Sequence, residues 1–213
     1  MTVSATNQGL KPGVCTSTSR PTSPFDGMMI YETDTNLVRI WNGTAWKTLA
    51  YSDYSSGSVI QVASTTKTDT FSASIAAGAS TAITGLSATI TPTASSSKIL
   101  VMAFVPMGIS VADSGPYLTL YRGATAVGVG AAAGSRQTVT TGMMGNSNLG
   151  TLGSAALSFL DSPSTTSATT YSVNVSHSSS VTRTVVVNRS SDDTDNIYWA
   201  RSSSSITLME IAG

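Results

Sequence analysis

The sequence is poor in charge. Only 10% of its 213 residues are charged, with 11 basic and 11 acidic side chains and a formal net charge of zero, whereas ordinary globular domains carry about a quarter. Because there is no basic excess to neutralise phosphates, nucleic-acid binding is not expected. A soluble monomer usually keeps more charge than this, so the composition fits a subunit that hides surface in an assembly.

Residues that could carry catalysis or hold a metal are scarce. Cys15 is the single cysteine and has no partner for a disulfide within the chain, and His177, the single histidine that could serve it as a base, is far away among serines. Ser95 and Lys98 have the spacing of a serine–lysine pair but lack its companion motifs. The acidic run at 192–196 does not match a calcium loop. We expect no enzyme activity, no metal and no cofactor.

Long apolar runs are also missing. No stretch approaches the roughly 18 apolar residues of a membrane helix. The N-terminus lacks the charged and apolar regions of a secretory signal peptide. We therefore expect no membrane insertion and synthesis in a cytoplasm.

Serine and threonine are dense throughout. Threonine, valine and isoleucine favour strands, whereas serine, glycine and asparagine favour turns. No segment has a convincing helical pattern. The composition predicts an all-β protein with a Ser/Thr-rich surface.

The densest local pattern lies in residues 20–49, RPTSPFDGMMIYETDTNLVRIWNGTAWKTL. It predicts three short strands, at residues 28–31, 37–41 and 45–47. Asn42-Gly43 predicts a type I′ hairpin turn, which needs positive φ at both central residues. The product would be a small β-meander with Tyr31, Trp41 and Trp46 as one aromatic cluster. So few residues cannot bury a core alone, so the unit should need a neighbour.

This stretch resembles a short module common in bacteriophage virion proteins, especially fibre and appendage proteins, with the pattern RP-x-SP-x-x-G-x-x-IYETDT…L-x-x-WNG-x-AW. In this chain the pattern stands as Arg20-Pro21, Ser23-Pro24, Gly27, Ile30–Thr35, Leu37, Trp41-Asn42-Gly43 and Ala45-Trp46. The rest of the chain more loosely resembles the β-rich C-terminal part of such proteins. The resemblance implies a structural role in a virion, without saying where on the particle.

After residue 58 the chain alternates between strand patterns and turns. Residues 98–105, KILVMAFV, are the most continuous apolar run and predict a central strand buried on both faces. Residues 128–153 are rich in Gly, Ala and Ser and predict either a long loop with a weak strand or a flat strand. The final strand, 205–211, places Ile206, Leu208 and Glu210 on one face.

The expected architecture is an antiparallel β-sandwich, jelly-roll-like, because about eight to ten strands follow one another at the spacing of such folds. The predicted organisation has four parts. They are an extended N-terminal arm (1–19), a β-hairpin attachment module (20–50), a linker (51–58) and the sandwich domain (59–213).

We predict a non-enzymatic phage virion structural protein on the exterior of the particle. The preferred form is a trimeric fibre or tail appendage that docks by its N-terminal region and displays the sandwich for host-surface attachment. The alternative is a capsid decoration or cement protein, or a head fibre, that stabilises the shell; a carbohydrate-active enzyme is an outsider. The expected partners are sister subunits in a homotrimer, other virion proteins (portal or tail, or the major capsid protein) and a host surface glycan.

Two sets of aromatic residues are candidate contacts. Tyr31, Trp41 and Trp46 are predicted to pack in an oligomer or attachment interface. Tyr198 and Trp199 are candidates for stacking on a sugar, although a core or interface tryptophan is the commoner case.

Overall fold

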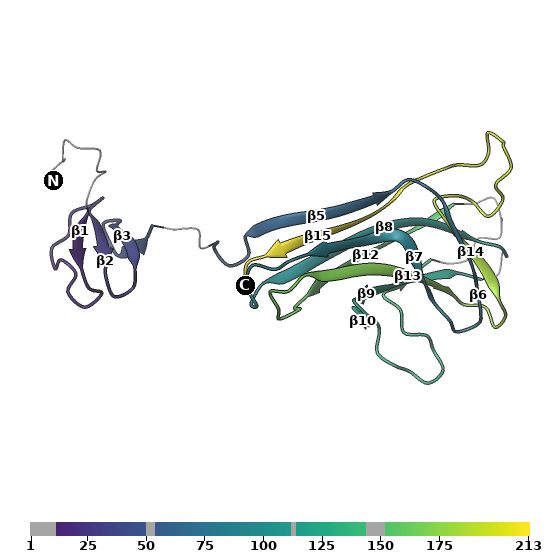
Figure 1. Cartoon of the computed structure of the whole chain (residues 1–213), viewed down its shortest axis with the longest axis horizontal. Coiled ribbons are helices and arrows are strands. Elements are labelled where there is room, and N and C mark those ends of the chain that lie inside the picture. Colours follow the sequence, from purple (N-terminus) through teal and green to yellow (C-terminus); the bar gives the residue numbers. More distant parts are fainter. Residues whose placement is uncertain (1–11, 50–53, 112–113, 144–151) are drawn as a thin grey trace. The chain divides into compact units, whose positions relative to one another are not determined.

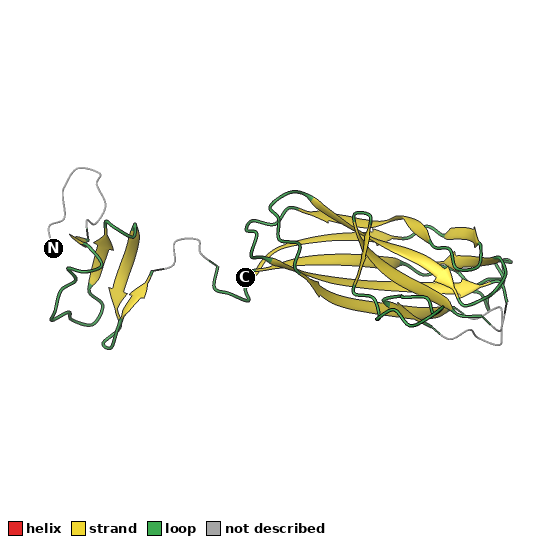
Figure 2. Ribbon diagram, turned by 90° about the horizontal axis from the view of Figure 1, so that it is seen from below, coloured by secondary structure: helices red, strands yellow, loops and turns green. Residues whose placement is uncertain are grey.

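The computed structural model describes residues 12–49, 54–111, 114–143 and 152–213. These form two compact units, residues 1–55 and 56–213, and each is described by itself. Figure 2 shows strands and loops, and the described residues contain no helix. The predicted all-β class is confirmed. A membrane-spanning helix is likewise not found in the part of the chain that is described.

The first unit is a four-stranded sheet in the order β1-β2-β3-β4 (Figure 1). Its strands are β1 (Gly13–Cys15), β2 (Met29–Glu32), β3 (Leu37–Trp41) and β4 (Trp46–Thr48). β1 runs parallel to β2, and the other pairs are antiparallel. The last three strands lie where the meander was predicted.

β1 lies within residues 1–19, which the sequence predicts to be an extended arm. The end of that segment instead joins the sheet: Ser17 donates from its backbone N and its Oγ to the Asp34 carboxylate, at 2.8 and 2.6 Å. These bonds offset the entropy of ordering a polar segment. Residues 1–11 lie outside the described residues.

The β3–β4 hairpin forms, but its turn is not the predicted type I′. Trp41 pairs with Trp46, so four residues form the loop. Gly43 has φ of 87°, whereas Asn42 is not among the residues with positive φ. The Asn42 side chain instead accepts hydrogen bonds from the backbone N of Thr44 and Ala45, at 3.1 and 2.9 Å. Asparagine closes the hairpin by mimicking a backbone turn.

The second unit is a sandwich of two antiparallel sheets (Figures 1 and 2). One sheet contains β5 (Val59–Lys67), β6 (Phe71–Ile75), β8 (Lys98–Ile109), β12 (Gly153–Asp161), β14 (Arg183–Val187) and β15 (Ser204–Ile211). The other contains β7 (Thr81–Ile90), β9 (Pro116–Arg122), β10 (Thr125–Val127), β11 (Thr141–Gly142) and β13 (Thr169–His177). Of the Gly-rich segment, the described residues 128–143 are mainly loop.

The strand pairing has jelly-roll order. β14 and β15 both pair with the same side of β8, one towards each of its ends. β6 then pairs with β14, and β5 pairs with β15. Each pair therefore acts as one interrupted strand. The first sheet has four positions, β5/β6, β14/β15, β8 and β12, and the second has β7, β13, β9 and β10/β11. This order, in which the chain alternates between the sheets except at the β9–β10 hairpin, is that of two Greek keys.

The loop of residues 188–203, which interrupts β14/β15, stands out from the sandwich (Figure 1). Asn188 closes its base. The Asn188 Nδ2 donates to the backbone O of Lys67 and of Asp69, both at 2.9 Å. These two acceptors lie at the break between β5 and β6. The Asn188 side chain therefore links the break in β14/β15 to the break in β5/β6 and supplies a hydrogen-bond donor to both carbonyl groups.

The inward-facing residues of both sheets form one apolar core. They include Ile206 and Leu208 of the final strand, as predicted, and Leu118, Leu120, Tyr171, Val173 and Val175 of the other sheet. Asp161 is buried at the edge of this core, where Arg122 Nη1 donates to both its oxygens at 2.9 and 2.7 Å and Tyr171 Oη donates at 2.6 Å. Burial and the Asp161 carboxylate raise the pKa of Tyr171, which therefore stays protonated as a donor.

The apolar run at 98–105 forms the central strand β8, but only one of its faces is covered. Val101, Ala103 and Val105 are buried in the core. Leu100 and Met102 are half-buried on the opposite face, and Phe104 is exposed. The prediction of burial on both faces is therefore wrong for the single chain.

Candidate assembly surface

The small sheet has two chemically different faces. Directly paired residues share a face, and successive residues alternate between faces. One face, here called the polar face after its Glu32–Arg39 ion pair, carries Ile30, Glu32, Leu37, Arg39, Trp41, Trp46 and Thr48. The other, here called the open face, carries Val14, Met29, Tyr31, Val38, Ile40, Lys47 and Leu49.

Glu32 is the centre of the polar face. It is fully buried, and its carboxylate accepts hydrogen bonds from Arg20 Nε, from Arg39 Nε at 3.2 Å and from Thr35 Oγ1 at 2.8 Å. The hydrogen bond from Arg20 is the largest cause that lowers the pKa of the Glu32 carboxyl. An ionised, fully paired carboxylate therefore fixes the segment before β2 against the sheet.

The predicted aromatic cluster is divided between the two faces. The rings of Trp41 and Trp46 lie 5.5 Å apart at 63°, an edge-to-face pair on the polar face. Tyr31 pairs with Val38 on the open face, and its Oη donates to Asn36 Oδ1 at 2.9 Å. The prediction of one three-residue cluster is wrong. Ile30 faces Arg39 and lies on the same face as the tryptophans, and Tyr31, the next residue along β2, points to the opposite face.

Within residues 12–49, no element covers the open face. Its members are apolar except for Lys47 on the edge strand, and all are half-buried or exposed. Among the described residues of the unit, Ile30 and Glu32 are the only buried ones. A sheet with so small a core needs further apolar contact for stability.

Tyr198 and Trp199 lie on the loop that interrupts β14/β15. Tyr198 is 79% exposed, whereas Trp199 is half-buried and its Nε1 donates to Thr194 Oγ1 at 2.8 Å. Asp193 holds the loop through Arg201 at 2.7 Å and Arg189 at 3.6 Å. The loop therefore presents the tyrosine ring to solvent and uses the tryptophan to hold its own shape.

The remaining reactive groups are dispersed. His177 is buried in the sandwich, where its Nε2 lies 2.8 Å from the Ile75 carbonyl O and its Nδ1 accepts from Ser179 N at 3.2 Å. Cys15 is half-buried in β1 of the other unit. Ser95 and Lys98 are both exposed. Over the described ranges, no three His, Cys, Asp or Glu side chains gather as metal ligands.

Residues 1–69 match a protein family described as a phage tail like trimerisation region. This match supports a structural protein of the phage tail type that forms homo-oligomers. It ends two residues beyond β5, so it includes the whole small sheet and the first strand of the sandwich. No curated protein matches the chain.

Two solved structures have limited similarity to this chain. A structure of infectious bursal disease virus strain Gx has 16% sequence identity and a TM-score of 0.40, and a VP2 subviral particle of the same virus has 14% identity and a TM-score of 0.39. Each alignment covers 81% of this chain, which spans only 40% and 41% of those chains. At these TM-scores the likeness contributes nothing to the assignment of function.

The sequence reasoning missed the open face and the role of Glu32. Both follow from strand parity: in the run Met29-Ile30-Tyr31-Glu32, a buried Ile30 requires Glu32 to lie on the same side. The pairing of Arg20 with Glu32 was not predictable, because Arg20 reaches it from a loop 12 residues away.

Proposed function

We propose that the protein is a non-enzymatic trimeric appendage subunit of a phage virion. It docks to the particle by its N-terminal region and displays the sandwich for attachment to the host surface. The observation that carries this proposal is the coincidence of the trimerisation match with a small sheet whose open face is apolar and is not covered by any of residues 12–49. Three such faces around an axis supply the missing core.

The two faces of the small sheet make different contacts, one with sister subunits and the other with the particle. Tyr31 and its neighbours on the open face meet sister subunits, since apolar side chains gain most from burial. Trp41 and Trp46, half-buried on the polar face, are the candidate contact with the particle. The residues before β2, tied to the sheet through Glu32 and Asp34, continue towards the docking site.

The sandwich is the displayed part. Its loop at 188–203 presents Tyr198 on an ion-paired frame, an arrangement suited to stacking on a sugar ring of a host glycan. A substrate-cleaving site is not part of the proposal, because the buried carboxylates Glu32, Asp161 and Glu210 are each engaged by hydrogen-bond donors. The proposed role is therefore adhesion.

Two measurements test the proposal. Sedimentation of the purified protein at micromolar concentration should give three times the single-chain mass of 21.8 kDa. Immunogold labelling of particles should mark the tail, with a few to some tens of copies per particle. A single-chain mass would refute the trimer, and hundreds of copies spread over the capsid would replace the appendage by a decoration protein.

A further inference from the structure

The outer surface of the β5-β15-β8-β12 sheet is a second apolar face, which the described residues of the sandwich leave without a covering layer. Three cross-strand rows run over it. The first joins Val62, Met209, Leu100 and Leu160; the second joins Ser64, Thr207, Met102 and Ser158; the third joins Thr66, Ser205, Phe104 and Ala156. We call these three rows the seam face.

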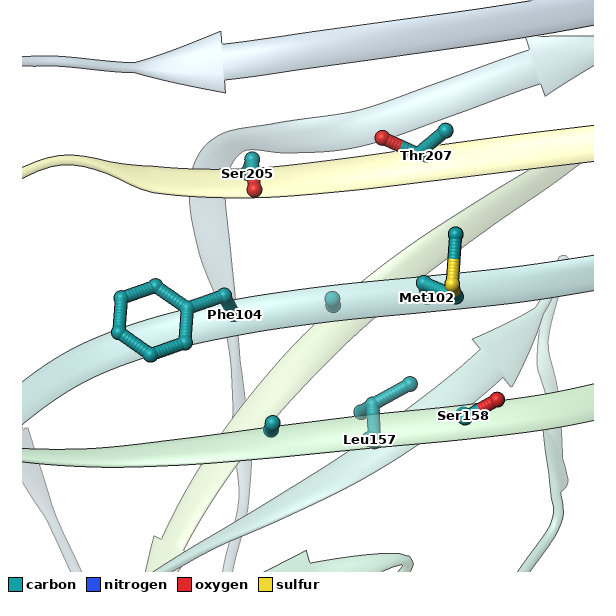
Figure 3. A pocket seen from close by; sticks show the side chains of 8 residues that line it. Met102, Phe104, Leu157, Ser158, Ser205 and Thr207 are labelled. Carbon is teal, nitrogen blue, oxygen red and sulfur yellow. The ribbon is translucent and has the colours of Figure 1, made fainter.

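Large apolar side chains are exposed on the seam face. Val62 is 57% exposed, Phe104 47% and Leu160 48%. Figure 3 shows part of the second and third rows, with Met102 and Phe104 on the central strand between Ser205 and Thr207 of β15 and Ser158 of β12. A shallow hollow of about 500 Å³ lies among them. Its size and its small flanking residues suit the insertion of apolar side chains from another surface.

The outer surface of the opposite sheet is different. Two outward residues of this sheet, Thr119 and Ser176, are buried. The half-buried or exposed outward residues on β7, β13 and β9 are mainly hydroxyl, phenol and amide side chains, namely Thr84, Ser87, Thr89, Ser172, Asn174, Tyr117 and Tyr121. Such residues are well solvated in water. The sandwich therefore has one surface suited to solvent and one suited to burial.

The sequence of the central strand, β8, has the pattern of a strand that is buried on both faces. Continuous apolar runs are typical of strands buried on both faces, and KILVMAFV is such a run. Among the described residues of the sandwich, none forms a second layer over its Leu100, Met102 and Phe104. A layer supplied by another molecule would give each of them the burial that the pattern indicates.

The occupant of the seam face should be uncharged and apolar. The three rows contain no charged side chain, and Lys98 lies just beyond them at the end of β8. Of the charged residues on these four strands, Lys67, Asp161 and Glu210 are buried on the inner side. A charged partner surface would be left unpaired here, whereas a second copy of the same face matches it.

The trimerisation match reaches this surface. Residues 1–69 include all of β5, and β5 contributes Val62, Ser64 and Thr66 to the seam face. We propose that the seam face is a second subunit contact, in which the sandwiches of three copies pack against one another. This inference rests on the proposed trimer and adds a contact to that of the small sheet.

Thiol labelling of the full-length protein tests the contact. Cys15→Ser removes the natural thiol, and Leu160→Cys or Val62→Cys places a new one on the seam face at positions outside the core. Ser87→Cys, exposed on β7 of the opposite sheet, is the matched control. Ellman's reagent should react at least about tenfold more slowly at the seam positions than at Ser87→Cys, because labelling then requires the contact to open. The rates should become equal in denaturant.

Sedimentation of the same samples separates the two proposals. Slow seam labelling in a protein of trimer mass supports the contact. Equal, fast labelling at all three positions in a protein of trimer mass would overturn the seam contact and leave the trimer standing. A single-chain mass would overturn both.

Discussion

Asn188 and Ser204, 16 residues apart, are joined by a buried hydrogen bond in which Ser204 Oγ donates to Asn188 Oδ1 at 2.6 Å. The bond draws together the two ends of the loop that interrupts β14/β15. Asn188 also has φ of 63°, a left-handed conformation that asparagine tolerates better than most residues. Asn188 therefore supplies both the left-handed backbone conformation and the hydrogen-bonding groups with which the chain leaves β14 and enters the loop.

Asn188→Ala should lower the free energy of unfolding of the sandwich by about 2–4 kcal/mol, because it leaves buried backbone groups unpaired and strains the backbone. Asn188→Gly should cost about 1 kcal/mol less, since glycine adopts positive φ without strain. Urea unfolding measures both. Asn196→Ala, in the exposed part of the same loop, should change stability by less than about 0.5 kcal/mol. Equal stability of the alanine variant and the natural protein would contradict this role.

The two glutamates of the chain, Glu32 and Glu210, are both fully buried, one in each unit. The pKa of Glu32 is lowered in the folded state, chiefly by the hydrogen bond from Arg20. Its contribution to stability is therefore present above the unfolded pKa, about 4.3, and is lost as the pH falls through the folded value. The small sheet should loosen in acid, and Glu32→Gln should reduce this acid dependence.

Tryptophan fluorescence can follow this effect. In a Trp199→Phe background, Trp41 and Trp46 report on the small sheet alone. Acid titration should show a transition that Glu32→Gln diminishes. Glu210→Gln makes the same chemical change in the sandwich and should leave the Trp41/Trp46 transition unchanged. Identical acid profiles for the natural protein and Glu32→Gln would show that Glu32 does not control it.

The sequence predicts the strands well and their surroundings poorly. Alternation in 171–175 and 205–211 identifies buried residues such as Val173 and Leu208 because period-two burial is a local property. It cannot say whether another layer covers the far side of a strand, so the exposed face of β8 was not predicted. The turn at Asn42 was predicted in position but not in type, because the side chain competes with the backbone for the turn's donors.

Long-range pairing was also out of reach. Nothing in the sequence between Val187 and Ser204 indicates that the strands on either side of the loop continue one another. Likewise, Arg122 and Asp161 pair across 39 residues, and neither stands in a recognisable motif. The candidate aromatic contacts were identified by residue type, whereas their division between two faces depended on register.

Asp161 holds two side chains at the edge of the core, so its loss should exceed the loss of either partner. Tyr171→Phe removes one hydrogen bond and should cost about 1 kcal/mol. Asp161→Ala leaves Arg122 and Tyr171 without their acceptor and should cost about 2–4 kcal/mol. Asp195→Ala, at an exposed position, controls for removal of a charge. Urea unfolding that ranks Tyr171→Phe as the more damaging change would contradict the arrangement.

Charge placed on the open face of the small sheet should weaken the trimer. Met29 is exposed there, so Met29→Lys is compatible with the fold of the single chain, but it would bury an unpaired ammonium group between subunits. The association constant should fall at least about tenfold, since 1.4 kcal/mol already has that effect and burying an unpaired charge costs more. Thr48→Lys adds the same charge at an exposed position on the polar face and is the matched control. Sedimentation equilibrium over a range of concentrations measures both, with far-ultraviolet circular dichroism to confirm that each variant is folded. If Met29→Lys and Thr48→Lys dissociate alike, the open face does not join the subunits; if Met29→Lys alone dissociates, the small sheet obtains its missing core from sister copies.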